Sequence, residues 1–255
     1  MSRPRVVLVN AAHEQGPTSR NFRRELDADV VEFHAVGGAV PPAPQDLDAD
    51  GVVVTGSRSS VYWDEDWIAP IEEWVSDAVE AGLPHLGVCW GHQLLADVLG
   101  GSVEDMGEYE IGYRTVTHHG GRLFEGVDEE FLVFATHSDA VTELPPGAEL
   151  TAENDYGVHG FRTGHVFGVQ FHPEYDMATA RRVTEGKDLP DERIQRVLDG
   201  VTDENYRRAC EAKQVFDNFL AYVEGVRAEA GDPGTDAGAE ATNADDDAET
   251  AATDD

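Results

Sequence analysis

The sequence GVCWGHQ at residues 87–93 joins an apolar run, Leu83–Cys89, to a segment of helical character, Gln93–Leu99. A short, continuous apolar run is typical of a strand that is buried on both faces of a sheet. Glycines two residues before and two residues after Cys89 indicate a sharp strand-to-helix turn, because small neighbours leave room for such a backbone. The turn would hold Cys89 at the edge of the sheet, where free helix N–H groups stabilise a thiolate. We therefore predict that Cys89 is a nucleophile.

The segments before this turn repeat its strand-and-helix rhythm. Apolar runs at Arg5–Ala11, Val30–Phe33 and Gly51–Thr55 predict three more buried strands. Helical patterns lie between them, at Ser19–Leu26 and Trp67–Ala81. Strands that alternate with helices through short connections predict an α/β fold, with a doubly wound, mostly parallel sheet and helices on both faces. Ligands of such sheets bind beyond the carboxyl ends of the strands.

The second half of the chain changes character. Short strands separated by Gly and Pro turns predict an antiparallel extension of the sheet, at Gly112–Thr117, Phe131–Ala135, Ala148–Ala152, Gly157–Arg162 and Val166–Phe171. Asp176–Arg227 is predicted to be helical, with interruptions near Gly186 and Gly200. We expect one domain over residues 1–228, with a helical insertion at 176–214 before the terminal helix. Residues 229–255 lack aromatic side chains and are strongly polar, which predicts a disordered acidic tail.

The charge of the chain is unusual. It has 51 acidic and 18 basic residues, a formal charge of -33, and its only lysines are Lys187 and Lys213. Acidic residues remain in large excess when residues 229–255 are set aside. This composition predicts a halophilic protein, because high salt screens the repulsion between carboxylates; the alternative is an ordinary acidic enzyme. Nucleic acid is disfavoured as a partner, because its binding depends on clustered Lys and Arg.

Several kinds of site and location are not indicated. The sequence shows neither an apolar signal core nor an apolar run long enough to span a membrane, so we expect a cytoplasmic protein without a membrane partner. Cys89 and Cys210 lack a paired spacing, which argues against a zinc site or a disulfide framework. His118 and His119 are adjacent, so their side chains diverge, and we expect no metal. No phosphate-binding glycine loop is present, and we expect no cofactor.

A second motif, GVQFHPE at residues 168–174, ends in His172 and Glu174. The intervening proline favours an extended backbone at His172, which places the two side chains on one side of the segment. A histidine held by a carboxylate is the usual partner of a nucleophile. Such a pair often lies on an ordinary surface, but here it accompanies the cysteine turn, and both follow predicted strands.

The two motifs together, in this order, resemble those of the class I (triad) glutamine amidotransferases. The resemblance covers roughly residues 5–175 and the terminal helix, and it implies a flavodoxin-like fold. It also implies that Cys89 attacks the side-chain amide of glutamine, forming a γ-glutamyl thioester and releasing ammonia. His172 would then transfer protons, and Glu174 would hold its imidazole.

The resemblance extends to residues that would bind the substrate. Gln93 matches a family glutamine that contacts it, and THSD at residues 136–139 is similar to the segment that receives its amino and carboxylate groups. Ser138 and Asp139 are therefore predicted to bind substrate, with Asp139 facing the ammonium group.

An oxyanion hole needs two backbone donors. The resemblance assigns one to Trp90 and the other to Gly56, although TGSR at residues 55–58 departs from the family's Pro-Gly-Gly type of turn. The long loop Ser57–Trp67 that follows could be a packed surface loop. We predict instead that it sets specificity, with Tyr62 and Trp63 near the pocket mouth.

Three functions remain open from the sequence. In the first, the chain is a stand-alone γ-glutamyl peptidase. In the second, it is a glutaminase subunit that feeds a separate synthetase, as in two-subunit GMP synthetases. In either role the ligand is glutamine or a γ-glutamyl compound. The third is a non-catalytic, glutamine-binding regulatory module, which the intact Cys89, His172 and Glu174 argue against.

Overall fold

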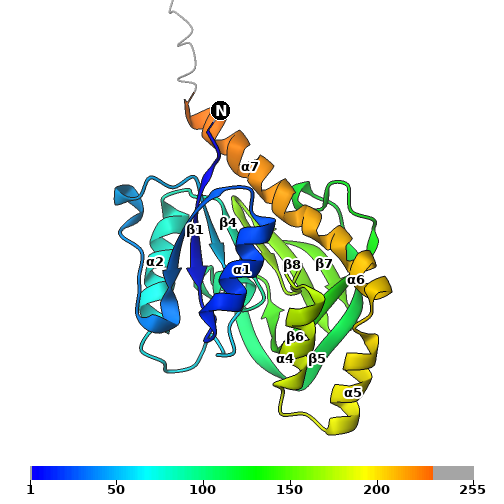
Figure 1. Cartoon of the computed structure of the whole chain (residues 1–255). Coiled ribbons are helices and arrows are strands. Elements are labelled where there is room, and N and C mark those ends of the chain that lie inside the picture. The colour runs from blue at the N-terminus through cyan, green and yellow to red at the C-terminus, as the bar shows by residue number, and fades with distance from the viewer. Residues whose placement is uncertain (1, 232–255) are drawn as a thin grey trace, which may run out of the picture.

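A nine-stranded mixed sheet forms the centre of the molecule, in the order β2-β1-β3-β4-β9-β8-β7-β5-β6 (Figure 1). The computed structural model describes residues 2–231. The parallel part holds the first five strands of that order: β2 (Asp29–His34), β1 (Arg5–Asn10), β3 (Gly51–Val54), β4 (His85–Val88) and β9 (Val166–Val169). The predicted doubly wound α/β sheet is confirmed, and the order of its parallel part is that of flavodoxin-like folds.

Helices cover both faces of the parallel part, as the continuous apolar runs require. Val6 and Leu8 of β1 belong to one core with α1 (Gln15–Glu25) and α7 (Gln214–Gly231), which lie on the same face (Figure 1). Val7 and Val9 point the other way, into a second core with α2 (Ile68–Glu80) and α3 (Trp90–Val98). Because successive residues of a strand face opposite sides, every residue of β1 after Arg5 is buried.

The antiparallel extension is also confirmed, but two of its strands are much longer than predicted. It consists of β8 (Gly157–Thr163), β7 (Glu149–Asn154), β5 (Ser102–His118) and β6 (Glu130–Glu143). The sequence suggested only Gly112–Thr117 and Phe131–Ala135 for the long pair. Polar residues and a register shift between Asp105 and Glu110 interrupt the alternation that marks a strand, although the pairing continues.

Helix α3, which follows Cys89, begins earlier than predicted. It begins at Trp90, whereas the sequence suggested Gln93. Gly91 is a weak helix former, but its place in the first turn has a packing reason. A Cβ atom on Gly91 would lie 2.3 Å from the backbone oxygen of Val54, so the helix packs directly against β3.

The helices after residue 176 break where predicted. They are α4 (Met177–Glu185), which ends before Gly186, α5 (Asp191–Gly200), α6 (Asp203–Ala209) and α7. The helix α7 continues through residues 229–231, which were assigned to the tail, and residues 232–255 of that predicted tail lie outside the described residues. Cys210, between α6 and α7, is partly exposed. Within residues 2–231, none of the helices combines the length and apolar character needed to cross a membrane.

Candidate active site

Three strand ends meet at the carboxyl edge of the parallel sheet. Gly56 follows β3, Cys89 follows β4 and His172 follows β9, and these three strands are neighbours. A Cβ atom placed on Gly56 would lie 2.9 Å from His172 Cε1 and 3.8 Å from Cys89 Sγ. The three residues named by the sequence motifs are therefore brought together, with Gly56 contacting both of the others.

The turn at Cys89 is strained. Its φ of 54° and ψ of -106° make it the only non-glycine residue with positive φ within residues 2–231. Such a conformation costs about 1–3 kcal/mol and persists only where the surroundings enforce it. Here the enforcement is close packing, since a Cβ atom on Gly87 would lie 2.3 Å from the backbone oxygen of Gly91. Both glycines are thus required for the cysteine to stand at the strand end.

The histidine is oriented from two sides. His172 Nδ1 lies 2.8 Å from Glu174 Oε1, and both side chains are buried. The imidazole stacks on Tyr175 with ring centroids 4.1 Å apart and an interplanar angle of 18°. With Nδ1 bonded to Glu174, Nε2 is the ring nitrogen left for chemistry at Cys89.

The charge of His172 follows from its neighbours. Burial alone would lower the pKa of His172, but the negative charges of Glu174 and Cys89, with their hydrogen bonds, raise it to about 10. The imidazole is therefore protonated at neutral pH.

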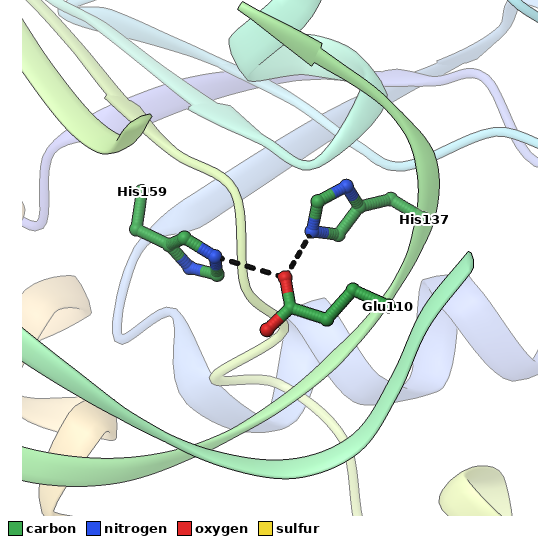
Figure 2. Close-up of side chains that lie close together, drawn as sticks. All are labelled: Glu110, His137 and His159. Carbon is green, nitrogen blue, oxygen red and sulfur yellow. Dashed lines mark hydrogen bonds and ion pairs between the residues drawn. The ribbon is translucent and has the colours of Figure 1, made fainter. Parts of the chain in front are cut away.

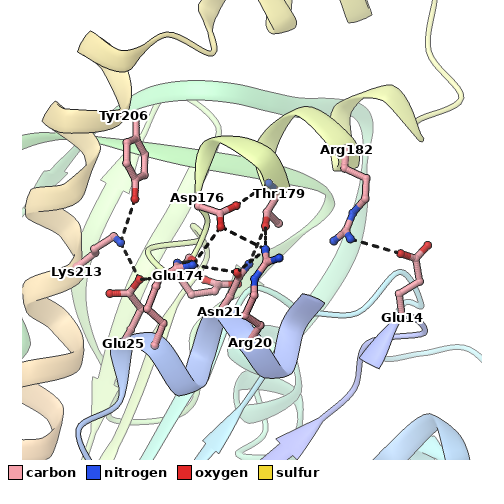
Figure 3. A network of polar contacts seen from close by, with 11 residues as sticks. Glu14, Arg20, Asn21, Glu25, Glu174, Asp176, Thr179, Arg182, Tyr206 and Lys213 are labelled. Carbon is pink, nitrogen blue, oxygen red and sulfur yellow. Dashed lines mark hydrogen bonds and ion pairs between the residues drawn. The ribbon is translucent and has the colours of Figure 1, made fainter. Parts of the chain in front are cut away.

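Helix α1 holds the backbone of the triad carboxylate. Arg24 donates to the backbone oxygen of Glu174 at 2.6 Å and, with Arg20, pairs with Asp176 at 3.1 and 3.2 Å (Figure 3). Asp176 also caps α4 by accepting from the N–H of Thr179 at 2.7 Å. The second oxygen of Glu174, Oε2, is buried without a hydrogen-bond partner among the described residues.

A pocket of about 250 Å³ opens beside Cys89, and we call it the acyl pocket. Its lining includes the three predicted substrate-binding residues, Gln93, Ser138 and Asp139. The amide nitrogen of Gln93 donates to the backbone oxygen of Asp139 at 2.9 Å and to Gln170 Oε1 at 3.1 Å. These bonds hold the Gln93 side chain in the pocket wall.

The loop Ser57–Trp67 closes one side of the acyl pocket. Ser60 and Tyr62 both donate to the carboxylate of Asp139, the latter at 3.1 Å. Trp63 lines the pocket, and its side chain and that of Tyr62 are 48% and 52% exposed. The loop Ser57–Trp67 is thus joined to the segment at residues 136–139, and Trp63 lies at the rim of the acyl pocket.

The backbone donors predicted for an oxyanion lie next to the sulfur. Trp90 is the first residue of α3, and its N–H is one of the four at a helix start that lack an intrahelical partner. A Cβ atom on Gly56 would lie 3.5 Å from Cys89 Cβ, so the Gly56 backbone is also close to the cysteine. Their role as oxyanion donors stays a prediction.

Comparison with known proteins assigns the family. Residues 21–185, more than half of the chain, match the family model described as glutamine amidotransferase class-I. The chain belongs to the class I glutamine amidotransferase family. It is 31% identical over 190 residues to the GMP synthase (glutamine-hydrolyzing) of Staphylococcus aureus strain JH9. That match covers 73% of this chain and 33% of the relative, so the chain spans about a third of the length of the relatives it matches.

Solved structures show the same fold. A glutamine amidotransferase of Thermotoga maritima superposes with a TM-score of 0.73 at 23% identity, covering 86% of this chain and 99% of that one. A glutamine amido transferase of Methylobacillus flagellatus gives a TM-score of 0.70 at 20% identity, covering 87% and 95%. The match to the family model ends at residue 185, before α5 begins.

One buried cluster in this amidotransferase was not predicted. Glu110 Oε2 lies 2.7 Å from His137 Nε2 and 3.0 Å from His159 Nε2 (Figure 2). Asn154 donates to the other carboxylate oxygen at 2.7 Å. The four residues come from four strands, β5, β6, β7 and β8, and the only signal in the sequence was the glutamate next to Ile111.

This cluster is a hydrogen-bond network. The three side chains are close enough to share a metal ion, with candidate ligand atoms within 4.8 Å of one another. However, His137 Nδ1 lies 2.8 Å from the backbone oxygen of Asp139 while Nε2 lies 2.7 Å from Glu110, so both ring nitrogens already have hydrogen-bond partners within the protein. Burial would raise the pKa of Glu110, but the hydrogen bonds from His137 and His159 outweigh it and lower the pKa. Glu110 is therefore an ionised carboxylate that is held by its neighbours' hydrogen bonds.

Proposed function

We propose that this amidotransferase hydrolyses the side-chain amide of glutamine, or a γ-glutamyl amide, through a γ-glutamyl thioester on Cys89. The observation that best supports the proposal is the triad geometry. A strained cysteine stands at a strand end, beside a buried histidine whose Nδ1 lies 2.8 Å from Glu174. Strain of this kind has no structural benefit, and it suits a nucleophile that must be held clear of its strand.

The proposed reaction has two steps. The thiolate of Cys89 attacks the amide carbon, the C–N bond breaks, and the imidazolium of His172 donates its proton to the leaving nitrogen. A water molecule then attacks the thioester, His172 accepts a proton from it, and glutamate leaves as the thiolate is restored. Proton transfer by a positioned group of this kind contributes about 10²–10⁴-fold to a rate.

The backbone and the acyl pocket would supply stabilisation and recognition. The N–H groups of Trp90 and Gly56 would bind the negative oxygen of the tetrahedral intermediate, and such a donor contributes about 10²–10³-fold. Gln93, Ser138 and Asp139 would bind the amino and carboxylate groups of the glutamyl part. The Asp139 carboxylate, already held by Ser60 and Tyr62, would be fixed in direction before substrate arrives.

We favour a self-sufficient hydrolase over a synthetase subunit. Two segments beyond the triad complete the acyl pocket: the loop Ser57–Trp67, and the connection after α4, which contributes Gly186, Lys187 and Asp188. The subunit alternative draws support from the GMP synthase relative, whose matched part is a third of its length. A non-catalytic module is disfavoured, because it would have no use for a strained cysteine beside an imidazolium.

A substrate screen of the purified chain tests the proposal. Glutamine and γ-glutamyl dipeptides are compared at high KCl by measuring glutamate and released amine, with Cys89→Ala as the control. We expect steady turnover by the isolated chain and none by the variant. Slow glutamine hydrolysis that rises only when a synthetase is added would favour the subunit role, and hydrolysis by Cys89→Ala would contradict the mechanism.

We also propose that the protein works in a salt-rich cytoplasm. The charge of -33 supports this, since so many carboxylates repel one another unless ions screen them. Measuring its unfolding at low and high KCl tests the idea, and equal stability at both would contradict it.

A further inference from the structure

Two pockets meet at the triad. The acyl pocket contains Cys89, and a second pocket of about 80 Å³ contains His172, Glu174 and Tyr175. Several residues line both, so the pockets adjoin: Ser57, Arg58, Thr136, Val183 and Lys187. The second pocket also reaches α1 through Glu14 and Thr18.

The proton donor decides which part of a substrate would occupy the second pocket. In the proposed reaction His172 gives its proton to the departing nitrogen, so the leaving group must lie on the His172 side of the scissile bond. We therefore call the second pocket the leaving-group pocket. At about 10–15 Å³ per water-sized group, its volume of about 80 Å³ holds roughly five to eight non-hydrogen atoms. That is the size of a small amino acid, and more than ammonia needs.

The charge of the leaving-group pocket is opposite to that of the chain. Arg58, Arg182 and Lys187 line it, although the protein as a whole has a charge of -33. Of its two carboxylates, Glu174 is paired with His172. Glu14 is shared between the arginines: it lies 3.2 Å from Arg58 and 4.0 Å from Arg182, and Figure 3 shows the contact with Arg182. One shared carboxylate cannot neutralise two guanidinium groups.

The lysine is the second sign of an anion site. Lys187 is one of only two lysines in the chain, and its ammonium lies 4.7 Å from the ring centre of Tyr109, to whose hydroxyl it donates. Within residues 2–231 no carboxylate lies within ion-pair distance of it, despite the abundance of acidic residues. Lys213, in contrast, pairs with Glu25 at 2.7 Å.

We infer that the leaving-group pocket recognises a carboxylate, and that the preferred substrate is a γ-glutamyl dipeptide whose second residue is small and has a free C-terminal carboxylate. Lys187 and Arg182 would bind that carboxylate as His172 protonates the adjacent nitrogen. This inference rests on the proposed function and names its substrate class. Contact pairs of this kind survive high salt better than long-range attraction, because screening acts mainly on separated charges.

The test compares three substrates at constant high KCl: γ-glutamylglycine, its C-terminal amide, and glutamine. The readout is the ratio of kcat/KM for the dipeptide to kcat/KM for its amide. An effect on the triad changes both values by the same factor, so it drops out of the ratio. Arg182→Gln and Lys187→Gln remove one cation each, and Lys187→Arg keeps the charge. Arg196→Gln is the matched control, because Arg196 is exposed on α5 and lines neither pocket.

We expect the unaltered chain to prefer the dipeptide over its amide by about tenfold or more, equivalent to about 1.4 kcal/mol. Lys187→Gln and Arg182→Gln should each bring the ratio close to one, while Lys187→Arg and Arg196→Gln keep it. Glutamine hydrolysis without this preference, or a ratio unchanged in both Gln variants, overturns the inference and leaves the proposed function standing. A folded chain that hydrolyses none of the three substrates overturns both.

Discussion

Two of the buried histidine–glutamate pairs within residues 2–231, His172–Glu174 and His137–Glu110, differ in what else their atoms contact. His172 and Glu174 are 2.8 Å apart, and His137 and Glu110 are 2.7 Å apart. All four side chains are almost fully buried. Residue types, distances and burial therefore do not distinguish the two pairs.

The remaining hydrogen-bonding capacity does distinguish them. Both oxygens of Glu110 accept hydrogen bonds, and the second nitrogen of His137 faces the backbone oxygen of Asp139. Glu174 instead has one oxygen without a hydrogen-bond partner within residues 2–231, and the free edge of His172 faces Cys89. A pair with every atom engaged holds strands together, whereas a pair with a free nitrogen next to a nucleophile can transfer protons.

Removing the nucleophile should have the largest effect. Cys89→Ala should lower the hydrolysis of glutamine and γ-glutamyl amides by about 10⁴-fold or more, because both proposed steps pass through its sulfur. The fold should persist, since a methyl group fits where the thiol was. Cys210→Ala is the matched control, because Cys210 is partly exposed and lies outside both pockets. Equal losses in the two variants would contradict the assignment of Cys89.

The pair His172–Glu174 should control the pH dependence of hydrolysis. The raised pKa of His172, about 10, keeps the proton that the leaving nitrogen needs, so kcat/KM should fall only as the pH rises through about 10. Glu174→Gln removes the main charge that raises this pKa. It should lower kcat/KM by about 10²-fold and move the alkaline limb to lower pH. A pH–rate profile with an unmoved alkaline limb would show that Glu174 does not act through His172.

The pair His137–Glu110 should affect stability more than catalysis. Glu110→Gln replaces the carboxylate that accepts hydrogen bonds from His137, His159 and Asn154 by an amide that carries donors of its own, which should cost about 1–3 kcal/mol of unfolding free energy. Denaturant unfolding at high KCl measures this, with the exposed Glu108→Gln as a control of equal charge change. If Glu110→Gln instead matched Glu174→Gln in activity loss and remained fully stable, the roles of the two pairs would be reversed.

Salt should have the smallest effect, and it should change the stability of the whole chain without changing the contribution of the pair His137–Glu110. Raising KCl should increase the unfolding free energy by at least about 1 kcal/mol, which is roughly 2–4 °C in Tm for a chain of this size. The reason is screening of surface carboxylates, which leaves buried pairs almost untouched. The stability difference between Glu110→Gln and the unaltered chain should therefore stay constant across KCl concentrations. A difference that vanishes at high salt would show that the Glu110 pair is accessible to ions.

Short motifs made the proximity of Cys89, His172 and Glu174 predictable from sequence. The turn at Cys89 needs glycines at fixed positions, and His172 and Glu174 flank a proline. A few positions of the sequence therefore predict the local backbone. The apolar runs likewise predicted the parallel sheet, since strands buried on both faces must be continuous. These features depend on neighbours in the chain.

The features that were missed depend on partners far away in the chain. The length of β5 is set by pairing with β6, which continues past a register shift that breaks the polar–apolar alternation. Glu110 meets His137 and His159 only because β8, β7, β5 and β6 lie side by side in the sheet. The bonds from the loop Ser57–Trp67 to Asp139 likewise link segments that no local pattern connects.

Peptide mapping after reaction with a glutamine-mimicking electrophile decides most directly whether Cys89 carries the glutamyl group. We predict one label per chain, on Cys89, prevented by excess substrate, with hydrolysis lost in proportion to labelling. His172→Ala should be labelled much more slowly at the same residue. Label on Cys210, or hydrolysis that persists when Cys89 is fully labelled, would contradict a mechanism that passes through a thioester on Cys89.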